Sequence, residues 1–324
     1  MDLEKSKVAC RNILSKMKFS RNDEMLIAFD EEKQDLAQIF AEQAIAIGGN
    51  PYMLKVPTPT ENKFASWFTN FLSDVVKNEF TVILLSNSMY RARGIMDAIG
   101  RPDKELKELS SRFFCDWTIP EDSFVRVYSA DPVEVESYRE VLLRELGVGG
   151  AMRVTTCLGT DVALQARGWI VSDGEVFTAA VESSANGVVL IDSSLYWGQP
   201  ESPIEVTLEN GRIKEIECLG AESKQYQAFL ADSKKDKGAS VLVELGIGVN
   251  PNADPRGHVM EAEQARGTCH FGFGNNIQFG GHNRSCIHYD GVVSKPTIYV
   301  DGHTVVLEGK LTSCDRRELP AVRP

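Results

Sequence analysis

Short apolar runs alternate with amphipathic stretches through the first third of the chain, and this rhythm constrains the fold more than any other feature. The runs typical of buried strands are Glu24–Phe29, Tyr52–Val56 and Phe80–Ser86. The stretches with helical spacing are Glu31–Ile47, Asn62–Val76 and Met89–Ile99. Strands that alternate with helices predict a parallel sheet covered by helices. This part of the chain lacks the glycine-rich motifs that bind phosphate, so we interpret it as a scaffold.

The pattern changes after a further predicted helix at residues 131–146. Asp131 is the expected N-cap of this helix, with Pro132 at its first position. The glycine-rich segment Gly147–Gly150 follows, and beyond it short apolar runs are separated by turn signals such as Asn-Gly. We therefore predict an α/β domain with a parallel sheet over residues 1–149. Residues 150–324 are predicted to form a mainly antiparallel β (α+β) domain.

Composition limits the classes of function. The chain has 324 residues, of which 43% are hydrophobic and 25% charged, so a packed core can form. A net charge of −11 argues against a nucleic-acid groove and against an anionic membrane surface. The seven cysteines occur singly, and neither a signal peptide nor an apolar span of about 20 residues is present. We expect a cytoplasmic protein with reduced thiols and no nucleic-acid or membrane partner.

The stretch Glu244–Asp290 concentrates residues that bind metals. It holds four of the five histidines of the chain among many glycines. His288 and Asp290 are two positions apart, so in a strand their side chains lie on the same face. With His270 and Glu244 they form a set of imidazole and carboxylate groups that suits Zn, Mn, Co or non-haem Fe. The sequence therefore predicts a metal site in this stretch.

Several motifs in this half resemble the M29 metallopeptidases, the family of aminopeptidase T and the thermophilic leucyl aminopeptidases. These motifs are ELGIGVNP (244–251), RGTCHFGFG (266–274), GGHNRSCIHYD (280–290), RVTTCLGTDV (153–162) and GEVFTAAVESSANGVVLID (174–192). The resemblance runs in order over about residues 150–310. It implies a metal centre whose ligands are Glu175, Glu244, His270, His288 and Asp290.

The resemblance also implies an activity. A metal-dependent hydrolase would use one or two divalent ions (Zn, Mn, Co or Fe) to activate a water that attacks a small amide or peptide-like substrate. A glutamate outside the ligand set would act as general base, and Glu263 and Glu182 are the two candidates. The family further implies a homodimer whose sites face an internal cavity.

This chain departs from the M29 pattern near the expected metal site. The family has a tyrosine seven residues after the histidine of its GTxH motif, and Ile277 stands there in this chain. The loss of a phenol removes a donor to a developing oxyanion. The segment before this motif reads Ala262-Glu263-Gln264, without the lysine of the family.

These departures keep two other functions open. The 2,5-dihydroxypyridine dioxygenases share the fold and the terminal HxD pair, and they use one iron ion. His270, His288 and Asp290 could supply the two-histidine, one-carboxylate triad of such an enzyme. The presence of Glu175 and Glu244 favours the hydrolase as the main interpretation. The third alternative is a non-catalytic binding protein.

Overall fold

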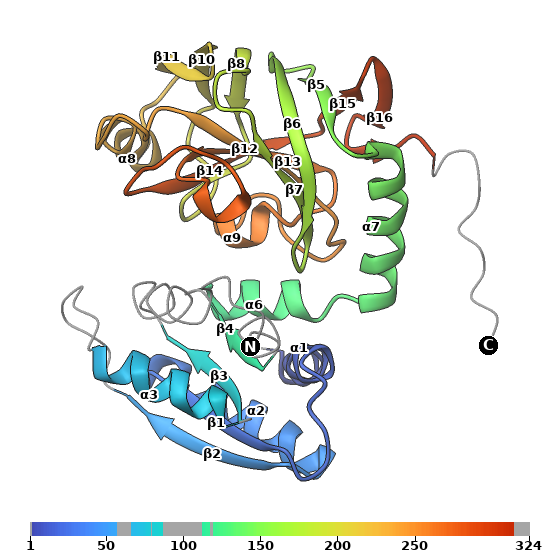
Figure 1. Ribbon diagram of the computed structural model, residues 1–324, viewed down its shortest axis with the longest axis vertical. Coiled ribbons are helices and arrows are strands. Elements are labelled where there is room, and N and C mark those ends of the chain that lie inside the picture. The colour runs from blue at the N-terminus through green and yellow to red at the C-terminus, as the bar shows by residue number, and fades with distance from the viewer. Residues whose placement is uncertain (1, 57–65, 79, 87–111, 117–118, 314–324) are drawn as a thin grey trace. The chain divides into compact units, whose positions relative to one another are not determined.

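The structure is a computed structural model that describes residues 2–56, 66–78, 80–86, 112–116 and 119–313 (Figure 1). The predicted helix Met89–Ile99 and the first four residues of the predicted helix Asn62–Val76 lie outside these ranges. The chain divides into two compact units, Met1–Ser129 and Ala130–Pro324. Within the described residues, no helix combines the length and the apolar character needed to cross a bilayer.

The first unit contains the predicted parallel sheet. Its strands are β1 (Glu24–Phe29), β2 (Asn50–Lys55), β3 (Thr81–Leu85) and β4 (Phe113–Cys115). The helices among its described residues are α1 (Leu3–Lys16), η1 (Glu31–Lys33), α2 (Gln34–Ile47), α3 (Ser66–Lys77) and α6 (Glu121–Tyr128). The strands pair in parallel in the order β2-β1-β3-β4. Because β1 and β3 lie inside the sheet, they need the continuous apolar runs that the sequence shows.

The second unit is an antiparallel sheet with few helices, as predicted. Its longer strands are β5 (Gly150–Thr155), β6 (Asp161–Val171), β7 (Glu175–Ala180), β8 (Asn186–Ile191), β10 (Ile204–Glu209), β11 (Arg212–Cys218), β12 (Leu242–Gly248), β13 (Thr268–Gly274), β14 (His288–Ser294), β15 (Thr297–Val300) and β16 (His303–Leu307). The short elements are β9 (Ser194–Leu195), β17 (Lys310–Leu311) and η2 (Ile277–Phe279). The helices are α7 (Pro132–Leu146), α8 (Lys224–Asp232) and α9 (Val259–Ala262). The main path of the sheet is β17-β16-β15-β5-β6-β7-β12-β13-β14-β9.

Helix α7 begins where the sequence predicts. The Asp131 carboxylate accepts a hydrogen bond from the Val133 backbone N–H at 2.9 Å, and Pro132 occupies the first turn. The helix contacts β7 and β16, so it belongs to the second unit. The division between the units therefore falls before this helix, whereas the sequence placed a boundary after residue 149.

Helix α8 covers one face of the strands that carry the predicted ligands. Its Phe229 is fully buried, and the ring centroid lies 5.7 Å from that of Phe273 on β13 and 5.1 Å from that of Tyr289 on β14. Side chains alternate between the faces of a strand. Phe273 and Tyr289 therefore support these strands from the face opposite to the neighbouring positions 272 and 290.

Removal of the Phe229 ring should destabilise the protein. We expect Phe229→Ala to lower the free energy of unfolding by about 3–5 kcal/mol, because a large side chain leaves a cavity in a packed core. Val148→Ala is the control, since Val148 is 93% exposed and its truncation should change stability by no more than about 0.5 kcal/mol. Urea unfolding of both variants measures the difference. A loss below about 1 kcal/mol for Phe229→Ala would contradict this packing.

Candidate metal centre

Four neighbouring strands bring the five predicted ligands onto one face of the sheet. β7, β12, β13 and β14 are consecutive in the sheet, and Glu175 lies opposite Gly248 in the first of these pairings. Gly272 on β13 lies opposite both Glu244 on β12 and Asp290 on β14. Because residues two apart in a strand share a face, His270 and His288 lie on this face as well. The sheet register therefore assembles a set that is spread over more than a hundred residues of sequence.

Glycines on the same face make room for the ligand side chains. A Cβ atom on Gly246 would lie 2.0 Å from the His270 ring. A Cβ atom on Gly272 would lie 2.7 Å from Glu244 Cβ and 2.8 Å from Asp290 Oδ1. Contacts this short do not occur, so the side chains of His270, Glu244 and Asp290 need glycine at both positions. In the run at residues 270–274, the histidine and the glycines therefore lie on one face of the strand, and the two phenylalanines lie on the other.

The functional atoms of the cluster lie close together. His270 Nε2 is 3.3 Å from Glu175 Oε2 and 3.5 Å from Glu244 Oε1. His288 Nε2 is 3.3 Å from Glu244 Oε2 and 3.5 Å from Asp290 Oδ1. One ligand atom from each of Glu244, His270 and Asp290 lies within 4.8 Å of the others. Two atoms bound to one ion at about 2.1 Å are at most about 4.2 Å apart, so small side-chain rotations would complete a site.

Burial differs across the cluster. The side chain of His270 is 1% exposed, that of Asp290 is 14% exposed and that of His288 is 20% exposed. The centre is therefore closed around His270 and more open on the side of β14. A small molecule would approach from that side.

Several buried polar atoms of the cluster lack a hydrogen-bond partner among the described residues. They are Glu175 Oε2, Glu244 Oε2, His270 Nδ1 and Asp290 Oδ1. Buried polar atoms without hydrogen-bond partners are costly, and the three carboxylates outnumber the two imidazoles that could carry a positive charge. A divalent cation would compensate the carboxylates. The donor set and its unsatisfied atoms therefore fit a metal ion.

The pKa values reflect the crowding of acids and imidazoles. Burial, together with the charges of Glu244 and Asp290, raises the pKa of Glu175 to about 7. Burial alone would lower the pKa of His270, but the surrounding carboxylates, led by Glu244, raise it to about 10. Without a metal ion, the folded cluster therefore holds protons more tightly than the unfolded chain does.

The orientation of His288 is set by the backbone. Its Nδ1 atom lies 2.8 Å from the carbonyl oxygen of Asn275. A carbonyl only accepts hydrogen bonds, so Nδ1 carries the proton and donates it. In the neutral ring that can bind a metal, Nε2 then keeps its lone pair and faces Glu244 and Asp290. This arrangement is common for histidines that bind metals through Nε2.

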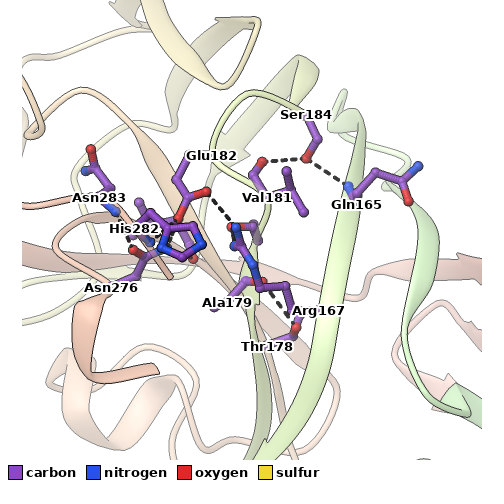
Figure 2. A network of polar contacts seen from close by, with 12 residues as sticks. Gln165, Arg167, Thr178, Ala179, Val181, Glu182, Ser184, Asn276, His282 and Asn283 are labelled. Atoms are coloured by element: carbon purple, nitrogen blue, oxygen red, sulfur yellow. Dashed lines mark hydrogen bonds and ion pairs between the residues drawn. The ribbon is translucent and has the colours of Figure 1, made fainter. Parts of the chain in front are cut away.

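The two glutamates predicted as general bases lie in different surroundings. Glu263 is the C-cap residue of α9 and is buried. Burial raises its pKa well above the usual range, and the charges of Glu175 and Asp290 add to the rise. Glu182 is paired with Arg167 at 2.8 Å instead (Figure 2). Burial alone would raise the pKa of Glu182, but this pairing and several hydrogen bonds hold it at about 2.

The sequence interpretation missed an aromatic group beside the cluster. Phe177 lies on the ligand-bearing face of β7, opposite Gly246. The ring of Phe279 is 5.0 Å from that of Phe177 and 5.5 Å from that of His288, edge-on to both. Ile277, at the position of the M29 tyrosine, is 39% exposed in the same short helix η2. Phe177 is two positions after Glu175 in the strand, so the two side chains share a face, and this spacing was the available sequence signal.

A parallel α/β unit joined to an antiparallel sheet with a histidine–carboxylate centre defines a metal-dependent enzyme. The sequence profile of the NicX family, 2,5-dihydroxypyridine 5,6-dioxygenase, matches residues 6–313, and the chain belongs to this family. A comparison with curated protein sequences finds no match.

Solved structures share the fold. The 2,5-dihydroxypyridine dioxygenase from Pseudomonas putida KT2440 superposes with a TM-score of 0.73 at 14% identity, covering 97% of this chain and 98% of that one. Wild-type AmpT from Thermus thermophilus superposes with a TM-score of 0.66 at 17% identity, covering 95% and 98%. The relation to both groups that the sequence motifs indicated is therefore confirmed at the level of the fold.

The main functional prediction from the sequence is wrong. The family match favours the ring-cleaving dioxygenase, which was the alternative, over a metal-dependent hydrolase. The hydrolase prediction rested on the presence of Glu175 and Glu244 beside the triad. Both residues do lie in the cluster, but the residue types of a metal centre do not by themselves determine its reaction.

Proposed function

We propose that this protein is a mononuclear non-haem iron dioxygenase that opens the ring of a hydroxylated pyridine. The observation that carries the proposal is the convergence of two imidazoles with carboxylates on one glycine-lined face, in a chain of this family. His270, His288 and Asp290 would hold the ion, as the two-histidine, one-carboxylate set that such oxygenases use. Glu244 lies between the two imidazoles as a further carboxylate.

Ferrous iron, when bound, would supply the one-electron chemistry that allows O₂ to react with an aromatic ring. The other tasks fall to the side chains. Glu175 lies at the edge of the cluster, where its carboxylate could accept a proton from a ring hydroxyl of the substrate. Burial and the neighbouring carboxylates raise the pKa of Glu263, which favours its protonated form.

The aromatic residues would contribute to ring binding. Phe279 stands beside His288, on the more exposed side of the centre. Its ring and that of Phe177 offer an apolar surface to a planar substrate, and aromatic pairs favour edge-on or offset contacts. An apolar wall also excludes water from the reacting ring. A small planar substrate fits these surroundings better than an extended peptide does.

The activity can be tested directly by oxygen uptake. Protein loaded anaerobically with Fe(II) should consume one O₂ for each 2,5-dihydroxypyridine lost, and protein loaded with Zn(II) should consume none. Hydroquinone tests whether the ring nitrogen is needed. His303→Ala is the matched control and should behave like the unmodified protein, because His303 is exposed on β16, away from the cluster. Stoichiometric iron without oxygen uptake or substrate loss would contradict the proposal.

A homodimer remains a prediction from the family resemblance. Sedimentation equilibrium of the full chain would give the mass of the assembly.

A further inference from the structure

Glu182 links two strands of the sheet to the loop beside the metal centre. It follows β7, and its Oε2 atom lies 2.8 Å from Arg167 Nη2 on β6 (Figure 2). Arg167 also donates to the Ala180 carbonyl at 2.6 Å. The guanidinium therefore fixes the carboxylate against the end of β7, the strand that carries Glu175.

The other oxygen of the same carboxylate holds the loop at residues 275–283, which we call the clamp loop. Glu182 Oε1 accepts hydrogen bonds from Asn276 Nδ2 at 3.0 Å and from the His282 backbone N–H at 2.6 Å. These donors lie near the two ends of the loop. One oxygen therefore ties both ends together (Figure 2).

Asn276 extends this link towards the metal ligands. It is fully buried, and its Nδ2 also donates to the carbonyl of Val243, the residue before Glu244, at 3.3 Å. Its Oδ1 accepts from the Asn283 backbone N–H at 3.0 Å. A Cβ atom on Gly281 would lie 2.1 Å from the Asn276 amide, so the loop packs directly on this side chain.

The clamp loop in turn contacts His288. The carbonyl of Asn275 accepts the hydrogen bond from His288 Nδ1 at 2.8 Å, and Phe279 packs edge-on against the imidazole. A displaced loop would move both contacts. The imidazole could then turn, and Nε2 would no longer point at Glu244 and Asp290.

We propose that Glu182 is a positioning residue of the metal centre. Through the clamp loop it fixes the Asn275 carbonyl, which selects the Nδ1–H tautomer of His288 and directs Nε2 towards the ion. This inference deepens the proposed function and rests on its metal site, but it does not depend on the reaction catalysed. It replaces the sequence interpretation of Glu182 as a general base, because both oxygens of this carboxylate are already engaged.

Two substitutions at residue 182 separate positioning from simple charge pairing. Glu182→Ala removes both interactions. Glu182→Gln keeps a carbonyl oxygen that can accept from Asn276 and His282, but it loses the ion pair with Arg167. If positioning is the role, Glu182→Ala should weaken Co(II) binding by about 10-fold, the lower end of the range for partners outside the ligand set. Glu182→Gln should recover most of the affinity.

The probe is Co(II) added to the metal-free full chain, followed by its visible absorption. We expect the Co(II) spectrum of Glu182→Ala to change in shape as well as in affinity. In the protein loaded with diamagnetic Zn(II), the ¹⁵N shifts of His288 should no longer report a single Nδ1–H form. Asp161→Asn is the matched control, because Asp161 on β6 forms an exposed ion pair with Arg153 on β5, at 2.7 Å. This control should bind Co(II) like the unmodified protein.

Each outcome decides one question. Unchanged Co(II) affinity, spectrum and tautomer in Glu182→Ala would overturn the positioning role, as would equal losses in Glu182→Ala and Glu182→Gln. If Glu182→Ala does not fold, Gly281→Ala tests the same loop, because the added methyl pushes on Asn276 without changing Glu182. Co(II) binding requires neither iron nor O₂. A dioxygenase assay that fails while Co(II) binds normally would therefore refute the proposed function and leave this inference standing.

Discussion

His270→Ala is expected to weaken Fe(II) binding by more than about 100-fold and to abolish oxygen uptake. Loss of a partner outside the ligand set weakens metal binding by about 10- to 100-fold, and loss of a ligand should exceed that range. His270 is the most enclosed member of the cluster, with Nε2 at 3.3 Å from Glu175 and 3.5 Å from Glu244.

A chromogenic chelator that competes for Fe(II) would measure the affinity, and an oxygen electrode would measure the reaction. His303→Ala serves again as the histidine control. Circular dichroism should show that His270→Ala is folded, because the substitution leaves the aromatic core around Phe229 intact. Near-normal iron affinity in His270→Ala would exclude the cluster as the iron site.

Local sequence signals predicted those parts of the fold that depend on neighbouring residues. The strand Glu24–Phe29 agrees with β1 at both ends, since a buried parallel strand needs an uninterrupted apolar run. Asp131 caps α7 as predicted, because an N-cap requires only a side-chain oxygen and the backbone N–H two residues later. The HxD pair lies on one face of β14 because side chains alternate in any strand.

Long-range register could not be predicted from the same signals. Glu175 reaches the cluster because β7 pairs with β12 so that Glu175 lies opposite Gly248, a pairing of residues more than seventy positions apart. The family resemblance supplied this residue, and its strand pattern alone did not. The engagement of Glu182 by Arg167 and Asn276 depends on a strand and a loop that meet only in the folded chain.

The residue types of the candidate metal site did not determine the reaction class. Imidazoles and carboxylates in one cluster suit both a hydrolytic ion and an oxygen-activating one. The family match favours the oxygenase, and the surroundings of the cluster agree with it. Phe279 and Phe177 form an aromatic wall, and Ile277 takes the place of a phenol. Only the fold brings Phe177, a hundred residues earlier in the chain, against Phe279.

Removal of the metal should destabilise the protein more strongly as the pH rises. The pKa of Glu175 is about 7 in the fold, above its ordinary value of 4.5, so the stability linked to its proton is present below pH 4.5 and lost as the pH rises through 7. The pKa of His270 is about 10 against an ordinary 6.5, so its contribution is lost between pH 6.5 and 10. The metal-free protein should therefore lose stability from this cluster between pH 5 and 8.

A divalent ion reverses this trend because it takes the place of the protons. Metal binding requires deprotonated ligands, so its affinity rises with pH while the proton-linked stability falls. An ion at a hundred times its Kd adds about 2.7 kcal/mol, which corresponds to roughly 5 to 10 °C in the midpoint of thermal unfolding. Titratable groups elsewhere in the chain affect the loaded and metal-free proteins alike, so the difference between the two midpoints isolates the cluster. Calorimetry with Co(II) or with chelator at pH 5, 6.5 and 8 should show a difference between the two unfolding midpoints that increases with pH. His270→Ala should show almost no such difference. A difference between the midpoints that stays constant or decreases with pH would mean that the ion is not held by the groups that bind the protons.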